Sequence, residues 1–191
     1  MRRAFLFMSL VALLAAVGIA GCVSTTLQTD WRDPGFRGKF GKVIVICIAK
    51  EMVVRNTLED DLSAQFIARG VAAIPSYTLF PSLQGVTREM IKARIKEADA
   101  DGVLLVRPMG KETVQRIQPD RNSFYEQWDG YSQAMSQTVD VYRIETSLFE
   151  TTGDRIVWQA VSDTFEGGPW MNTLKEFAQV MGAKLIERGL I

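Results

Sequence analysis

Histidine is absent from this chain of 191 residues, and its absence constrains function more than any motif does. It excludes catalytic triads that use an imidazole base and metal sites built on histidine. The 22 basic residues are balanced by 22 acidic ones and form no basic patch, so nothing indicates nucleic-acid binding. The phosphate loops G-x-G-x-x-G and G-x-x-x-x-G-K-[ST] are also missing. We therefore expect a protein that is not an enzyme and that holds no metal.

Cysteine is scarce, since only Cys22 and Cys47 occur in the chain. Cys47 lies among β-branched residues of the apolar run 43–48, where a buried and inert thiol is the usual state. We therefore expect Cys47 to be a core residue and not a nucleophile. If Cys22 is lipidated, as the amino-terminal segment described below implies, Cys47 has no partner for an intramolecular disulfide.

The amino-terminal segment has the pattern of an export signal. Arg2 and Arg3 precede an apolar run over residues 4–20, and the run ends in small residues at the sequence Ile-Ala-Gly-Cys of residues 19–22. This ending resembles the lipobox of bacterial lipoproteins. The resemblance implies a signal peptide at 1–21, cleavage between Gly21 and Cys22, and a diacylglycerol and an N-acyl chain such as palmitate on Cys22 as the only covalent additions. The alternative is an uncleaved transmembrane helix, for which the run is at the short end of the roughly 17 to 25 residues required.

Residues 22–39 are mostly polar and contain the turn-forming sequence Asp33-Pro34-Gly35, so we expect a polar tether there. Val23 stands where the inner-membrane retention signal of Gram-negative lipoproteins has aspartate. By that resemblance we expect the periplasmic face of the outer membrane as the location. Residues 40–191 are of a length typical of one globular domain.

Hydrophobic periodicity predicts an α/β (mixed α+β) domain. A run of β-branched residues at 42–49 without polar alternation indicates a strand covered on both faces. The order of patterns predicts a mixed sheet of about five strands, β-α-β-α-β followed by an antiparallel hairpin, packed by three helices. The expected strands are 42–49, 71–77, 103–106, 138–150 and 155–165, and the expected helices are 51–69, 87–98 and 170–188.

Two groups of side chains deserve a functional hypothesis. Residues 108–137 show no sustained period, and we expect an irregular aromatic loop whose contact residues for a partner or ligand are Phe124, Tyr125, Trp128 and Tyr131. Alternatively, these aromatics fold back over the sheet and complete the core. The acidic run 59–61 is expected to be a solvated helix face, because consecutive helical residues diverge by about 100°.

Several stretches resemble a known group of proteins. They are the strand sequence Lys-Val-Ile-Val-Ile of residues 42–46, Ala-Arg-Gly at 68–70, Ile-Pro-Ser-Tyr at 74–77 and Val-Trp at 157–158. Together with the lipobox they resemble small proteobacterial lipoproteins of uncharacterised function. The domain is similar to the type shared by the TolB amino-terminal domain, the curli-secretion lipoproteins and the lipoprotein activators of penicillin-binding proteins. The resemblance implies a membrane-anchored periplasmic domain that binds other envelope proteins.

Three functions remain open at this point. The first is a non-enzymatic envelope lipoprotein that acts as a protein-binding adaptor or assembly factor through residues 108–137. The second is a periplasmic module that binds a small ligand or a glycan with the same aromatics. The third is a subunit of a secretion pore, which requires long amphipathic hairpins and is disfavoured by the alternating polar residues of 138–165.

Overall fold

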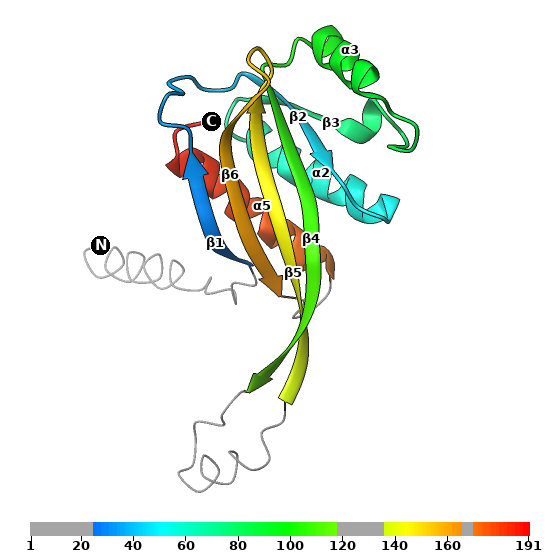
Figure 1. Ribbon diagram of the computed structural model, residues 1–191, viewed down its shortest axis with the longest axis vertical. Coiled ribbons are helices and arrows are strands. Elements are labelled where there is room, and N and C mark those ends of the chain that lie inside the picture. The colour runs from blue at the N-terminus through cyan, green and yellow to red at the C-terminus, as the bar shows by residue number, and fades with distance from the viewer. Residues whose placement is uncertain (1–24, 118–135, 166–169) are drawn as a thin grey trace, which may run out of the picture.

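The computed structural model describes residues 25–117, 136–165 and 170–191. They form a six-stranded mixed sheet in the order β1-β6-β5-β4-β2-β3 (Figure 1). The strands are β1 (Thr25–Arg32), β2 (Lys42–Cys47), β3 (Ala72–Pro75), β4 (Gly102–Ile117), β5 (Ser136–Glu150) and β6 (Arg155–Phe165). The helices are α2 (Met52–Ile67), the short 3-10 helix η1 (Ser76–Thr78), α3 (Arg88–Ala98) and α5 (Trp170–Glu187). The α/β fold class predicted from periodicity is confirmed.

The parallel half of the sheet is built around β2, which pairs in parallel with β3 on one side and with β4 on the other. Its residues 43–47 are all buried. Val43, Val45 and Cys47 belong to the main core, whereas Ile44 and Ile46 belong to a second cluster that includes Ile95 and Ala98 of α3. The prediction of a strand covered on both faces is therefore confirmed.

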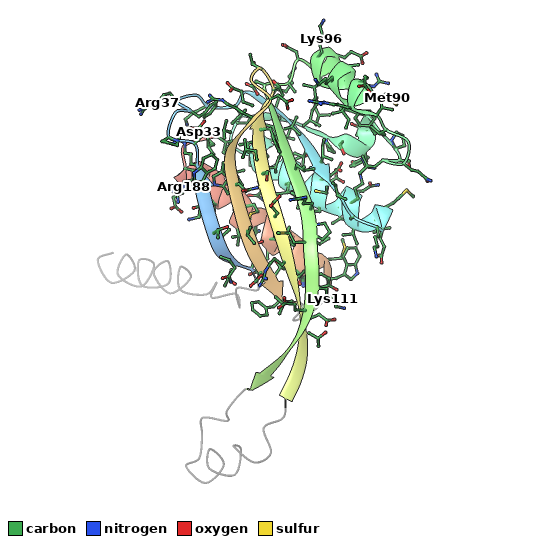
Figure 2. All side chains as sticks on the ribbon, in the orientation of Figure 1. Asp33, Arg37, Met90, Lys96, Lys111 and Arg188 are labelled. Carbon is green, nitrogen blue, oxygen red and sulfur yellow. The ribbon has the colours of Figure 1, made fainter. Side chains whose placement is uncertain are left out.

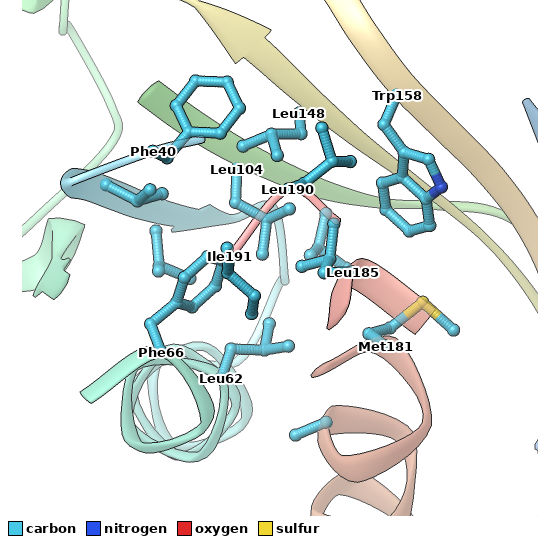
Figure 3. Close-up of a cluster of buried hydrophobic side chains, with 14 of the residues drawn as sticks. Phe40, Leu62, Phe66, Leu104, Leu148, Trp158, Met181, Leu185, Leu190 and Ile191 are labelled. Atoms are coloured by element: carbon cyan, nitrogen blue, oxygen red, sulfur yellow. The ribbon is translucent and has the colours of Figure 1, made fainter. Parts of the chain in front are cut away.

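The main core lies between the sheet and the two long helices. In Figure 1, α2 and α5 lie on the same face of the sheet, and α3 lies near the end of the sheet where β4 begins. Figure 3 shows how the helices pack on the sheet. Leu62 and Phe66 from α2 and Met181 and Leu185 from α5 point toward Leu104, Leu148 and Trp158 of the sheet. The indole of Trp158 is fully buried in the same cluster. No helix within the described ranges is long and apolar enough to cross a bilayer.

The antiparallel half carries a long two-stranded extension. β4 pairs with β5 down to Ile117 and Ser136, whereas the pairing of β5 with β6 ends at Val141 and Phe165. Residues 113–117 and 136–140 therefore pair only with each other among the described strands, and we call them the projecting ribbon. At about 3.4 Å per residue, the ribbon extends roughly 17 Å beyond the end of β6. Figure 1 shows it leaving the sheet at the end where β1 begins.

Two predictions about irregular segments are wrong in part. Residues 25–32 of the expected polar tether form β1, which pairs antiparallel with β6 and adds a sixth strand. A polar sequence suits this position because β1 is an edge strand in which only Thr25 is buried and the other residues are half-buried or exposed. Residues 108–117 and 136–137 of the expected aromatic loop belong to β4 and β5. Residues 108–113 are exposed, so this part of β4 needs no apolar alternation.

Candidate functional site: an apolar cavity beside β2

A cavity of about 410 Å³ lies where β2 ends and the amino-terminal ends of α2 and α5 face the sheet. Its apolar lining comes from four elements and from the residue after β2, and comprises Ile48, Val54, Leu58, Val106, Ile144 and Leu174. Trp170 and Thr173 from the first turn of α5 and Lys50 and Glu51 ahead of α2 complete the wall. The cavity is therefore mostly hydrocarbon on the inside with a few polar groups.

Exposed apolar side chains are concentrated next to this lining. Ile48 and Trp170, which line the cavity, are 47% and 41% exposed. Met52 and Val53 follow the lining residue Glu51 and are also exposed, as is Met171 beside Trp170. Large apolar residues left in water at one place on a surface indicate a contact site.

Beside the cavity, a buried ion pair holds the end of β2 to the start of α2. The Arg55 Nε donates to Glu59 Oε1 at 3.0 Å, and both side chains are almost fully buried. Glu59 also accepts hydrogen bonds from the backbone N–H groups of Cys47 (3.0 Å) and Tyr77 (2.8 Å) and from the Ser76 hydroxyl (2.7 Å). Because both carboxylate oxygens of Glu59 have partners, the pair fixes the strand, the helix and η1 together.

The remaining bonds of Arg55 continue this network into the loop after η1. Its Nη2 donates to the Ser76 hydroxyl at 2.8 Å and to the Phe80 carbonyl at 2.9 Å. The prediction that residues 59–61 form a solvated face is therefore wrong for Glu59, which follows the buried Leu58 and is itself fully buried. The neighbouring Asp60 is exposed, as predicted, and accepts a hydrogen bond from the Tyr77 hydroxyl at 2.7 Å.

Cys47 is one of the residues that line the cavity, and it is 1% exposed. Burial raises its pKa well above the usual value, and the negative charge of Glu59 raises it further against the opposing effect of Arg55. A thiol with a raised pKa carries little thiolate and is a poor nucleophile. The prediction of a buried Cys47 is confirmed.

The first described residue of the chain lies next to the cavity. Thr25 pairs with Thr164, and their hydroxyl oxygens are 3.1 Å apart. Thr164 itself lines the cavity. The amino-terminal end of β1 therefore contacts a residue of the cavity wall.

β1 is held in this position by Asp30, whose carboxylate joins β1, β6 and α5. The Trp158 Nε1 donates to Asp30 Oδ1 at 2.7 Å, and the Arg188 guanidinium donates to Oδ2 at 2.6 and 2.9 Å. Lys184 adds a second positive charge at 3.6 Å. β1 is thus an integral strand of the domain and not a loose connection.

Most residues predicted to form sites lie outside the described residues. This applies to Gly21 and Cys22 and to the four aromatics Phe124, Tyr125, Trp128 and Tyr131. Among the residues that the structure describes, no group of three or more Cys, Asp or Glu is arranged to hold a metal ion.

Sequence reasoning missed the cavity and the buried ion pair. The signal for the pair is the spacing Arg55-x-x-x-Glu59 beside the apolar stripe Val54, Leu58 and Leu62, because a charged pair four residues apart at the edge of a stripe can turn inward together. The cavity has no local signal, since residues from five separate segments line it.

The described residues define a mixed α/β domain in which two long helices cover one face of a six-stranded sheet. No protein-family model matches the sequence, and no curated protein matches it. In three dimensions the chain is similar to a PelC dodecamer subunit from Paraburkholderia phytofirmans (12% identity, TM-score 0.48, 84% of this chain and 96% of that chain). It is also similar to the lipoprotein GNA1162 from Neisseria meningitidis (8% identity, TM-score 0.44, 77% of this chain and 99% of that chain). Likeness at this distance carries no functional argument.

Proposed function

We propose that the chain is a non-enzymatic lipoprotein of the bacterial envelope, anchored through lipidated Cys22 on the periplasmic face of the outer membrane, that acts as a protein-binding adaptor or assembly factor. The anchor is argued from the sequence of residues 1–22. The adaptor role is argued from one structural observation, which is the register that relates the start of β1 to the projecting ribbon.

This register puts four residues of four strands side by side. Thr25 of β1 pairs with Thr164, Thr164 pairs with Tyr142, and Tyr142 pairs with Lys111 of β4. Cys22 precedes Thr25 by only three residues, which span at most about 10 Å. The projecting ribbon begins two residues beyond Lys111 and leaves the sheet at the same end (Figure 2). Anchoring at Cys22 would therefore hold the ribbon close to the membrane surface.

A ribbon of this kind is suited to contact with proteins. Its two strands have unpaired backbone edges among the described strands, and such edges are templates for strand addition by another chain. The adjoining face carries ion pairs, Arg107 with Glu145 at 2.7 Å and Arg143 with Asp163 at 3.0 Å, that give it charged groups of both signs. We therefore propose the ribbon as the contact surface and a protein at or in the membrane as the partner.

Photo-crosslinking in intact cells tests this function. A photoreactive residue replaces Thr113 at the start of the ribbon, and a matched control replaces Lys96 on α3, at the opposite end of the domain (Figure 2). We expect one recurring envelope protein to be crosslinked from position 113 and not from position 96, and the crosslink to be lost in Cys22→Ser. The same products from both positions, or none from position 113, would contradict the adaptor role.

The cavity favours a second candidate, a module that binds a small ligand. A lining that is mostly apolar does not suit a glycan, whose many hydroxyl groups need polar partners when they leave water. Hydrocarbon is the chemistry that this site fits.

A further inference from the structure

We infer that the cavity between β2, α2 and α5 is a binding site for an acyl chain, and that its occupant is one of the acyl chains attached to Cys22. The inference rests on the proposed function, because it requires that Cys22 be lipidated. It assigns a ligand to a cavity that the adaptor role does not use.

The lining has the chemistry of a hydrocarbon site. Leu58, Val106, Ile144 and Leu174 form apolar walls from two helices and two strands. The cavity volume of about 410 Å³ lies within the roughly 300 to 1,000 Å³ typical of small-molecule sites. An apolar cavity gains most from an apolar guest, because burial of hydrocarbon on both sides removes it from water without breaking hydrogen bonds.

The short distance in sequence between Cys22 and the cavity favours the acyl chains on Cys22 as the occupant. Thr25 is hydrogen-bonded to the lining residue Thr164, and Cys22 is three residues upstream, a stretch of backbone that can span at most about 10 Å. A lipid attached there has a high local concentration at the cavity, because its entry is intramolecular. A free lipid from the bilayer or a partner's apolar side chain has no such advantage.

The exposed apolar side chains at the rim of the cavity give the acyl chain a path into it. Ile48 and Trp170 line the cavity and are also about half exposed, and Val53 is exposed beside the lining residue Val54. An acyl chain lying across these side chains covers apolar surface that otherwise faces water. The three chains expected on Cys22 also permit the arrangement, because two acyl chains are enough for stable membrane anchoring.

Metabolic labelling tests the inference in the full-length protein. Cells are grown with a fatty acid that carries a diazirine and an alkyne, then irradiated, and the purified protein is digested and analysed by mass spectrometry. We expect crosslinks that join the lipid of the Cys22 peptide to peptides containing Val54, Ile144 or Leu174. Val54→Trp on α2 and Thr173→Trp on α5, which both add a bulky side chain to the cavity lining, should reduce this crosslink to the level of the unirradiated sample. Ile67→Trp, at an exposed position near the other end of α2, should leave it unchanged.

The outcomes separate this inference from the proposed function. Absence of label on Cys22 would overturn the lipoprotein assignment and the acyl site with it. Label on Cys22 without a crosslink to the lining would overturn the acyl site alone. A phospholipid adduct on the lining peptides, with the Cys22 lipid uncrosslinked, would show that the bilayer supplies the chain and would overturn the stated occupant. Crosslinks that survive in both tryptophan variants would also overturn the site.

Discussion

Asp30 and Arg188 lie 158 residues apart in the sequence and form a two-bond ion pair, at 2.6 and 2.9 Å, that joins the first strand to the residue that follows α5. The same carboxylate accepts a hydrogen bond from the buried indole of Trp158. Three elements from the two ends of the domain therefore meet at one side chain. This contact keeps the amino-terminal strand in a defined position beside the cavity.

Asp30→Asn should lower the free energy of unfolding by about 1 to 3 kcal/mol at pH 7, because it removes charge from these bonds. Burial disfavours the charged carboxylate, but the hydrogen bonds from Arg188 and Trp158 and the charges of Arg188 and Lys184 outweigh it and lower the pKa of Asp30 below its usual 3.8. A lowered folded-state pKa stabilises the fold above the unfolded-state pKa, and this stabilisation is lost as the pH falls through the folded-state pKa. Denaturant titrations should show the difference between wild type and variant shrinking in acid.

Asp154→Asn is the matched control for this prediction. Its carboxylate pairs with Arg88 at 3.2 Å, but both side chains are 72% exposed, so water screens the pair. We expect almost no change in stability. An equal loss in both variants, or a loss in Asp30→Asn that persists unchanged in acid, would contradict the role given to Asp30.

The buried pair of Arg55 and Glu59 should show strong coupling. Glu59→Leu leaves the Arg55 guanidinium buried without its carboxylate and should cost about 3 to 5 kcal/mol. Arg55→Leu leaves the complementary charge and should cost a similar amount. The double variant should be less destabilised than the sum by about 1 to 3 kcal/mol, because neither charge is then left alone.

Chemical denaturation of the four proteins measures this coupling in a double-mutant cycle. Glu97→Leu, which removes the exposed partner of Arg94, serves as the control for the loss of a carboxylate on a helix. Additive losses in the cycle would mean that Glu59 acts through its backbone partners alone.

Gly182 on α5 permits the close approach of α2. A Cβ atom at this position would lie 2.8 Å from the Cβ of Gln65 and 3.0 Å from its Cγ. The Cβ of Gln65 is attached to the backbone, so the helices must separate. We expect Gly182→Ala to destabilise the domain by about 1 to 2 kcal/mol despite the higher helix propensity of alanine.

Thermal unfolding compares this variant with Gly110→Ala in β4, where a Cβ would meet no atom within 4 Å. The second variant should unfold near the wild-type temperature. If Gly182→Ala is as stable as Gly110→Ala, the close helix contact is not a constraint on the fold.

Cys47 should resist alkylation in the native protein. In Cys22→Ser it is the remaining thiol, and its burial and raised pKa leave almost no accessible thiolate. Labelling with a maleimide should therefore be slow in buffer and become fast only at denaturant concentrations that unfold the domain. Rapid native labelling would contradict the burial of the thiol.

The periodicity of apolar residues in the sequence predicted most of the fold, because each buried helix or strand carries its own pattern of apolar residues. β2 is apolar on both faces, α2 has its stripe at Leu58, Leu62 and Phe66, and Thr87 caps α3 by accepting a hydrogen bond from the Met90 N–H. β1 was not predicted because a half-exposed edge strand has few apolar residues, and its pairing with β6 depends on residues more than 120 positions away.

The site was less predictable than the fold. The cavity is lined by residues of α2, α5 and several strands, and no single segment encodes that arrangement. The inward turn of Glu59 depends on donors at Cys47, Ser76 and Tyr77 that the sequence order does not bring together. The anchor at Cys22, by contrast, is a contiguous motif and stays a prediction of the sequence.

Lipidation of Cys22 can be measured by mass spectrometry of the protein purified from its native membrane and digested. We predict an amino-terminal peptide that begins at Cys22 and carries the mass of a diacylglycerol and an N-acyl chain. A protein that retains Met1 and an unmodified thiol at position 22 would contradict the lipoprotein assignment, the location and the acyl-chain site together.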